Sequence, residues 1–134
     1  MLQSDMSIKQ PKARIFKTKK FSKSAAKARI SDAELCEAIR QVMVGQAVDL
    51  GGGVFKKRLS SNTHRSIVLA KGAKLWIFQH LFAKNETGNI EVDELVAFRL
   101  LAKAYENLAS EKLAMLIASK DLQEICYEKK EVQK

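Results

Sequence analysis

Hydrophobic positions along the chain follow two different periods. Apolar residues three or four positions apart predict helices, and these segments are 21–29, 32–44, 91–108 and 110–117. Four other segments alternate or are continuously apolar, which is typical of strands: 14–19, 54–60, 65–70 and 75–82. The order strand, two helices, three strands, two helices predicts a single α+β domain.

Short polar stretches set the ends of these elements. Ser31-Asp32-Ala33-Glu34 has the pattern of a capping box, in which the serine hydroxyl and the glutamate carboxylate satisfy free amides at a helix start. Ser22 is a candidate cap for the preceding helix, and Gly45 is placed to end the helix that follows the box. Short links such as 71–74 join the last three strands, which predicts an antiparallel meander. The strand 75–82 is apolar on both faces and is expected to be the most covered one.

Charge is distributed unevenly along the chain. The 134 residues carry a net charge of +9, and residues 1–84 hold 17 Lys and Arg against 5 Asp and Glu. A surface this basic is typical of proteins that meet a polyanion. Nucleic acid or a ribonucleoprotein is therefore the expected partner, ahead of an acidic protein or an anionic membrane. No apolar run approaches the roughly 20 residues of a membrane-spanning helix, so no membrane partner is expected.

The length of the chain suits one domain. Residues 14–127 are predicted to form it, between a flexible N-terminal tail, 1–13, and a frayed C-terminal tail, 128–134. Cys36 and Cys126 lack the spacing of a metal site, and they are expected to be reduced thiols of a cytoplasmic protein and not a disulfide. Neither a metal site nor a cofactor is expected.

Two motifs stand out at the ends of predicted strands. The first combines three glycines with three consecutive cations, in Asp49-Leu50-Gly51-Gly52-Gly53-Val54-Phe55-Lys56-Lys57-Arg58-Leu59. The second is Phe82-Ala83-Lys84-Asn85-Glu86. The glycines do not make a nucleotide-binding loop, because neither Lys-Ser, Lys-Thr nor a predicted helix follows them. They are expected to form a flexible turn that lets the cationic strand enter the sheet.

Both motifs resemble those of the RelE-like toxins, which belong to the RelE/ParE superfamily and to bacterial type II toxin–antitoxin systems. The resemblance extends in order from about residue 14 to about residue 125 and is supported by 16–22, 30–38 and 93–95. It implies a RelE-like fold, with N-terminal helices packed on the antiparallel meander and C-terminal helices flanking it. One departure is the short loop 60–64, where relatives usually carry a longer hairpin rich in Gly, Lys and Ser. Because this loop would touch substrate, recognition or activity can differ from that of relatives.

The function that the resemblance implies is an arrest of translation. Relatives cleave mRNA in the ribosomal A site without a metal ion, using mainly basic side chains. Carried over to this chain, the catalytic residues are Lys56, Arg58, Arg65, Lys84 and Glu86, and the further RNA-binding residues are Lys57, His64 and Asn85. The implied partners are mRNA on the ribosome and a neutralising antitoxin, often a helix-turn-helix DNA-binding protein. No small-molecule cofactor is implied.

Elementary chemistry explains why such residues suit RNA cleavage. The ribose 2′-OH attacks the adjacent phosphorus, and fixed cations stabilise the charge that develops on the phosphorane. Strand alternation places Lys56 and Arg58 on one face and Lys57 on the other, with the expected core residues Phe55 and Leu59. Lys56 and Arg58 are therefore favoured for the substrate face, and Lys57 is the weaker candidate.

Acid–base groups are harder to assign. His64 lies beside Arg65 in the short loop and is a candidate to face RNA, whereas His80 alternates with apolar residues and is expected to be a hydrogen-bonded core or edge histidine. Glu86 is a candidate to accept a proton or to orient Lys84. Neither Tyr105 nor Tyr127 occupies the place of the catalytic tyrosine that some relatives use.

Three other interpretations of the basic segment stay open. The cations can simply protect a solvated edge strand from aggregation. A ParE-like toxin shares the architecture but poisons DNA gyrase by binding, and it has no need of several cations on one surface. A degenerate, non-catalytic module would bind nucleic acid with a steep dependence on salt and would cleave nothing.

Overall fold

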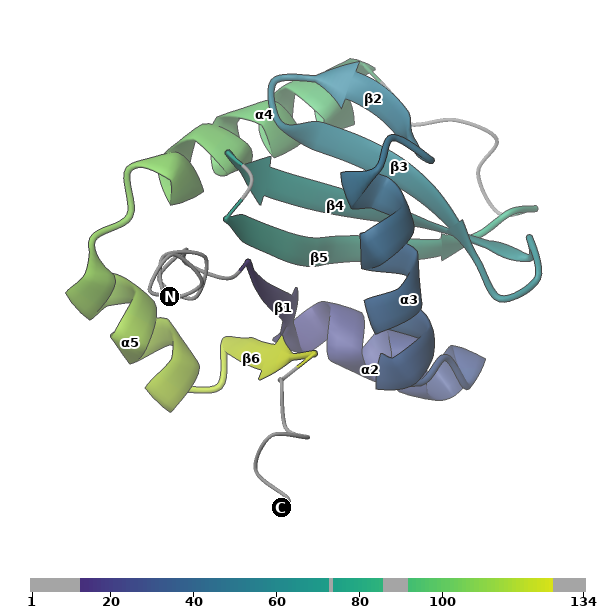
Figure 1. The fold of residues 1–134 in the computed structure, drawn as a ribbon, viewed down its shortest axis with the longest axis horizontal. Helices are drawn as coiled ribbons and strands as arrows, with labels where there is room; N and C mark the ends of the chain where they lie inside the picture. Colours follow the sequence, from purple (N-terminus) through teal and green to yellow (C-terminus); the bar gives the residue numbers. More distant parts are fainter. Residues whose placement is uncertain (1–12, 73, 86–91, 127–134) are drawn as a thin grey trace, which may run out of the picture.

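The computed structural model describes residues 13–72, 74–85 and 92–126, and these form one mixed sheet with helices on both faces (Figure 1). The strands are β1 (Arg14–Thr18), β2 (Val48–Gly51), β3 (Val54–Leu59), β4 (His64–Lys71), β5 (Leu75–Ala83) and β6 (Leu122–Ile125). The helices are α2 (Lys19–Ala28), α3 (Asp32–Met43), α4 (Val92–Glu106) and α5 (Ser110–Ala118). The predicted α+β class is confirmed. The predicted tails, 1–13 and 128–134, lie outside the described residues except for Ala13.

The strand order across the sheet is β2-β3-β4-β5-β1-β6. Within the row β2-β3-β4-β5 each neighbouring pair is antiparallel, so the predicted meander is confirmed. β1 pairs with β5 in parallel and with β6 antiparallel. The two edge strands, β2 and β6, were missing from the sequence prediction because four residues are too few to show a period.

Two separate cores lie on opposite faces of the sheet. On one face α2 and α3 pack over Phe78 and Val68, and the buried Leu35 and Ile39 belong to this core. On the other face α4 and α5 cover Ile67 and the remaining inward side chains. The expected arrangement, N-terminal helices on the sheet and C-terminal helices flanking it, is confirmed (Figure 1). β5 contributes buried residues to both cores, as predicted for the most covered strand.

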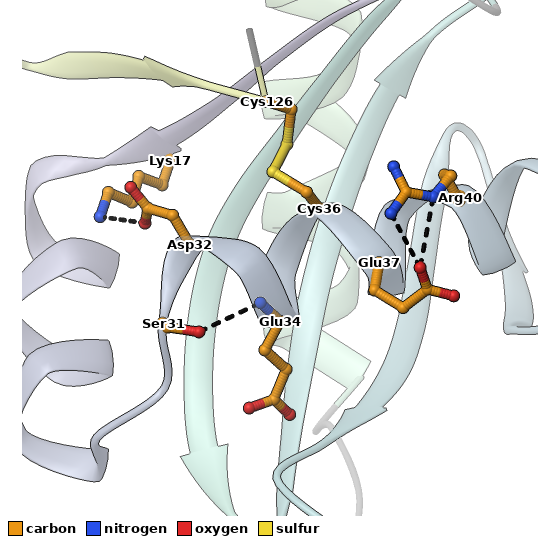
Figure 2. The surroundings of a disulfide bond; sticks show 8 residues. All are labelled: Lys17, Ser31, Asp32, Glu34, Cys36, Glu37, Arg40 and Cys126. Atoms are coloured by element: carbon orange, nitrogen blue, oxygen red, sulfur yellow. Dashed lines mark hydrogen bonds and ion pairs between the residues drawn. A yellow bond between two sulfur atoms is a disulfide. The ribbon is translucent and has the colours of Figure 1, made fainter. Parts of the chain in front are cut away.

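The helix starts differ from the sequence prediction in two details. Thr18, and not Ser22, caps α2, because its hydroxyl accepts a hydrogen bond from the amide of Phe21 at 3.0 Å. Ser31 caps α3 as predicted, by accepting from the amide of Glu34 at 3.2 Å (Figure 2). The carboxylate of Glu34 does not complete the capping box, since it accepts from the amide of Ser60 at 2.5 Å. Glu34 thereby ties α3 to the turn after β3.

A disulfide bond joins Cys36 on α3 to Cys126, directly after β6 (Figure 2). The prediction of two reduced thiols is therefore wrong. The cysteines are 90 residues apart in sequence, but the pairing of β6 with β1 brings Cys126 close to α3, and the two Cα atoms lie 5.5 Å apart. That separation suits a disulfide. Sequence spacing could not reveal it, because it depends on an edge strand that the pattern did not predict.

Gly53 allows β3 to approach β4 closely. Its φ is +83°, its carbonyl accepts from the amide of Ala70 at 2.8 Å, and an added Cβ would lie 2.8 Å from the Ala70 carbonyl oxygen. We expect Gly53→Ala to lower the free energy of unfolding by about 3 kcal/mol, because left-handed strain and a backbone clash add. Gly72→Ala is the matched control, since its φ is +58° and, among the described residues beyond its chain neighbours, no atom lies within 4 Å of its Cβ position.

Urea unfolding of both variants separates the two effects. Gly72→Ala should cost only about 1 kcal/mol, the penalty of the left-handed backbone alone. Equal losses in the two variants would contradict the close approach between β3 and β4.

Candidate nucleic-acid interface

The pairing of β3 with β4 brings three of the predicted site residues to one face of the sheet. Lys56 lies opposite Ile67, and Arg58 lies opposite Arg65. Ile67 belongs to the core under α4, so Lys56, Arg58 and Arg65 share the α4 face, at the end of the strands where that core stops. The alternation predicted for Lys56 and Arg58 agrees with this placement. Their side chains extend the apolar face of the sheet as a cationic surface.

Arg58 and Arg65 are direct cross-strand neighbours, with Cβ atoms expected about 5 Å apart. Like charges in this position destabilise a sheet. Within residues 13–72, 74–85 and 92–126, neither arginine forms an ion pair with a carboxylate. Arg58 is exposed to solvent, whereas Arg65 is half-buried. The pair therefore holds two uncompensated charges together at the surface, an arrangement that suits an anionic ligand better than it suits stability.

Several other cations among the described residues are paired with carboxylates. Lys17 is bonded to Asp32 at 2.8 Å, and Arg40 is bonded to Glu37 at 2.8 Å (Figure 2). Both pairs involve α3, on the opposite side of the sheet from Arg58. These carboxylates therefore pair with cations on the other side of the sheet. In the described ranges, no carboxylate pairs with Arg58 or Arg65.

The short loop between β3 and β4 orients the Arg65 side chain. One guanidinium nitrogen, Nη1, donates to the carbonyl oxygens of Asn62 and His64, each at 3.2 Å. Three consecutive residues of the loop have a positive φ, at Ser60, Ser61 and Asn62. This conformation turns the carbonyl of Asn62 toward the guanidinium and leaves the remaining nitrogens of Arg65 without a carboxylate partner.

Lys84 and Asn85 lie beside the same loop. The amide of Lys84 donates to the carbonyl oxygen of Thr63 at 2.8 Å, which fixes the end of β5 against the β3–β4 turn. Both side chains are exposed. The structure therefore brings the second motif close to Arg65. Glu86, the remaining residue predicted from that motif, lies outside the described residues.

Lys57 and His64 lie on the opposite face from Lys56 and Arg58. The ammonium of Lys57 donates to the carbonyl oxygen of Gln46 at 3.0 Å, and burial, together with the neighbouring Arg58, lowers the pKa of Lys57. His64 pairs with Leu59 in the register and lines a hollow of about 270 Å³ beside Lys27 on α2. Neither side chain joins the cationic surface on the α4 face.

His80 joins that surface, which the sequence did not predict. Ile67 pairs with His80 and Val68 pairs with Phe78, so a β-bulge at Gln79 adds one residue to β5. Before the bulge, Phe78 faces α2 and α3; after it, His80 and Phe82 face α4. Simple alternation grouped His80 with Trp76 and Phe78, which lie on the other face. A bulge that contains neither glycine nor proline cannot be recognised from the sequence.

The structure also bears on metal and membrane binding. Across the described ranges, no three His, Cys, Asp or Glu side chains gather closely enough to hold a metal ion. None of the helices among these residues is long and apolar enough to cross a membrane.

Comparison with known families decides the assignment. The model of the RelE toxin of the RelE/RelB toxin–antitoxin system matches residues 13–125. The chain belongs to this RelE toxin family. Membership makes the protein the toxin of a toxin–antitoxin system and implies a cognate antitoxin. No curated protein matches the sequence of this toxin. The family match covers every described strand and helix, and it includes the whole cationic surface.

Proposed function

We propose that the toxin inhibits translation by cleaving mRNA on the ribosome, without a metal ion. The observation that carries this proposal is the pair Arg58 and Arg65, two arginines opposite each other on neighbouring strands, with no carboxylate partner in the described residues. A purely structural surface would gain stability by separating or compensating these charges. A phosphodiester that reacts through a phosphorane would bind between them, because each planar guanidinium can donate two parallel hydrogen bonds to phosphate oxygens.

The reaction requires little from the protein apart from alignment and charge. The 2′-OH of a ribose attacks the adjacent phosphorus, and the bond from phosphorus to the 5′ oxygen breaks. The products are a 2′,3′-cyclic phosphate and a 5′-hydroxyl. In this scheme Lys56, Arg58 and Arg65 hold the phosphate and stabilise the negative charge that grows on its oxygens. Lys84 adds a fourth cation from the end of β5.

The other residues carried over from the family have supporting roles in the proposal. Asn85 contacts RNA beside Lys84, and Glu86 orients Lys84 or accepts a proton. Lys57 and His64 face away from the cationic surface, so they would meet RNA only outside the cleavage site. The site is incomplete without an aligned mRNA, and the ribosomal A site supplies that alignment, since positioning can contribute a large part of the rate.

The antitoxin is proposed to neutralise the toxin through charge. An acidic segment would cover the basic surface, where it competes with mRNA for Arg58 and Arg65. Such a segment would extend from a helix-turn-helix DNA-binding protein encoded beside the toxin. Both proteins would act in the cytoplasm, where translating ribosomes are found.

Induction of the toxin in growing bacteria tests the proposal. A reporter mRNA should be cut inside its reading frame, and a copy that lacks its start codon should stay intact, because it is not translated. Mapping of new 5′ ends measures both. Growth arrest with uncut reporter and with double-strand DNA breaks would instead support a ParE-like gyrase poison. Tight binding to nucleic acid with no arrest would support a non-catalytic module.

A further inference from the structure

Helix α2 carries a group of exposed lysines that the proposed cleavage site does not use. These lysines, called the α2 ridge below, are Lys19, Lys20, Lys23 and Lys27. Residues 19–29 contain no Asp or Glu, and Arg29 adds a further exposed cation at the end of the helix. By contrast, α3, α4 and α5 each carry charges of both signs, as an ordinary solvated helix does.

The helical period places the four lysines on one side of α2. At about 100° per residue they fall within an arc of about 100°. Phe21 and Ala25, the buried residues of this helix, lie on the opposite side, in the core shared with α3. The ridge is about 12 Å long, because eight steps of about 1.5 Å separate Lys19 from Lys27. The lysines therefore form one continuous basic surface on the α3 side of the sheet (Figure 1).

The helix carries this charge at a cost to its own stability. Lys19 and Lys20 occupy the first turn, where the positive end of the helix dipole favours acidic residues. Lys19, Lys23 and Lys27 are four residues apart, so each has a like charge on the next turn. The helix ends at Arg29 with a φ of +59°, a left-handed conformation for which glycine is usual. Stability alone would favour other residues at these positions.

No carboxylate in the described part of the chain neutralises the ridge. The acidic residues Asp32 and Glu37 on the neighbouring α3 pair with Lys17 and Arg40. Within residues 13–72, 74–85 and 92–126, the ridge lysines form no ion pair. Four uncompensated ammonium groups on one helix side attract a polyanion.

The ridge ends beside the proposed cleavage site. Lys27 lines the hollow of about 270 Å³ together with His64, at the start of β4, and Ala83, at the end of β5. Lys84, the fourth cation of the proposed site, follows Ala83 directly. The α2 ridge and the cationic surface on the α4 face therefore approach the same end of the sheet from its two sides. A large RNA assembly can contact both at once.

We propose that the α2 ridge docks the toxin on the ribosome by binding the phosphate backbone of ribosomal RNA. This inference rests on the proposed cleavage of mRNA on the ribosome, and it assigns docking and cleavage to two different surfaces. Lysine suits docking because its ammonium group binds phosphate as a point charge and reads no base. Folded ribosomal RNA is a fixed target, so docking on it would position the cationic surface over the mRNA.

A titration of cleavage with mRNA-carrying ribosomes tests docking separately from chemistry. The variant Lys20→Gln/Lys23→Gln/Lys27→Gln should need at least about tenfold more ribosomes for half-maximal cleavage, because three phosphate contacts are lost. Its rate at saturating ribosomes should stay within about twofold of wild type. Its melting temperature should be unchanged or higher, because a cation leaves the first turn of α2.

The matched control is Lys103→Gln/Lys112→Gln/Lys120→Gln. It removes the same charge from exposed lysines on the α4 and α5 side of the sheet. Neither its half-maximal ribosome concentration nor its saturating rate should change by more than about twofold.

Cosedimentation with ribosomes that carry no mRNA measures docking without cleavage. Wild-type affinity should fall steeply as salt is added, since binding of phosphates releases counterions. The slope of log affinity against log salt should be smaller by about 2 to 3 in the α2 variant, at about 0.7 to 0.9 for each phosphate contact.

The outcomes separate the docking role from the nuclease. Equal losses in the α2 variant and the control would overturn docking by the ridge, since net charge alone would then matter. So would an unchanged half-maximal concentration, a loss confined to the saturating rate, or a melting temperature below that of wild type. Wild-type ribosome binding together with lost binding to vesicles of anionic phospholipid would assign the ridge to a membrane instead. A wild-type toxin that cuts no mRNA but binds ribosomes through the ridge would overturn the nuclease and support the docking surface.

Discussion

Reduction of the disulfide between Cys36 and Cys126 is expected to lower the free energy of unfolding by about 4 kcal/mol. The bond closes a loop of 90 residues, about two-thirds of the 134-residue chain. In the chain-entropy account, a longer loop removes more conformations from the unfolded state, so its closure stabilises the fold more. Such a loss is a large part of the free energy of unfolding of a native domain, which is typically about 5–15 kcal/mol.

The position of the bond explains why the effect concerns the whole fold. Cys126 follows β6, which is also held by a short ladder with β1, by the ion pair of Glu124 with Arg14, and by burial of Leu122 and Ile125 in the two cores. Cys36 is on α3, which packs on the opposite face of the sheet (Figure 2). The disulfide therefore adds a covalent link to an edge strand of only four residues.

Urea unfolding with and without a thiol reductant measures this contribution. The double variant Cys36→Ser/Cys126→Ser is the control, and its unfolding should match that of the reduced wild type in both conditions. Wild-type protein that unfolds at the same urea concentration with and without reductant, after the bond has been shown to open, would contradict the prediction. Because disulfides are rare in the cytosol, the redox state in cells also decides how stable the toxin is there.

The double variant Arg58→Ala/Arg65→Ala is expected to cleave mRNA at least about 10³-fold more slowly than wild type. Removal of a single preorganised donor to a developing oxyanion typically costs about 10²–10³-fold, and these two donors face the same phosphate in the proposed site. The single variant Arg58→Ala should lose about 10²-fold and should unfold at the same or a higher temperature, since it relieves the repulsion from Arg65.

Arg40→Ala is the matched control for these variants. Arg40 is also an exposed arginine, but it lies on α3, on the other face of the sheet, and it pairs with Glu37. Its removal should leave cleavage unchanged and should alter stability by no more than about 0.5 kcal/mol, as for a typical surface ion pair. If Arg58→Ala loses stability and activity in parallel, the arginine pair has a structural role and the proposed phosphate site is wrong.

The strand β3 shows how much of the site the sequence could predict. Its alternation separates Lys56 and Arg58 from Lys57, because Phe55 and Leu59 must face a core. The short link after it required β4 to return beside it, which brings Arg65 near Arg58. These features depend on local pattern and on chain connectivity, and both can be read directly from residues.

The features that the sequence missed depend on contacts between distant segments. The bulge at Gln79 changes the face of His80, yet no residue type at that position signals it. The disulfide depends on β6 pairing with β1, more than 100 residues earlier in the chain. Likewise, Glu34 has the spacing of a capping box, but it bonds to the amide of Ser60 on a turn that only the folded sheet brings near.

The most direct test of the account removes one atom of the substrate, the 2′ oxygen at the position of the cut. Purified toxin is mixed with ribosomes that carry an mRNA in the A site, and a second mRNA has one 2′-deoxynucleotide at the position of the cut. The account predicts cleavage of the first mRNA on ribosomes, much slower cleavage of the same mRNA when free, and no cleavage at the deoxy position. Cleavage that persists at the deoxy position would contradict attack by the 2′-OH, and the absence of any cleavage would contradict the nuclease.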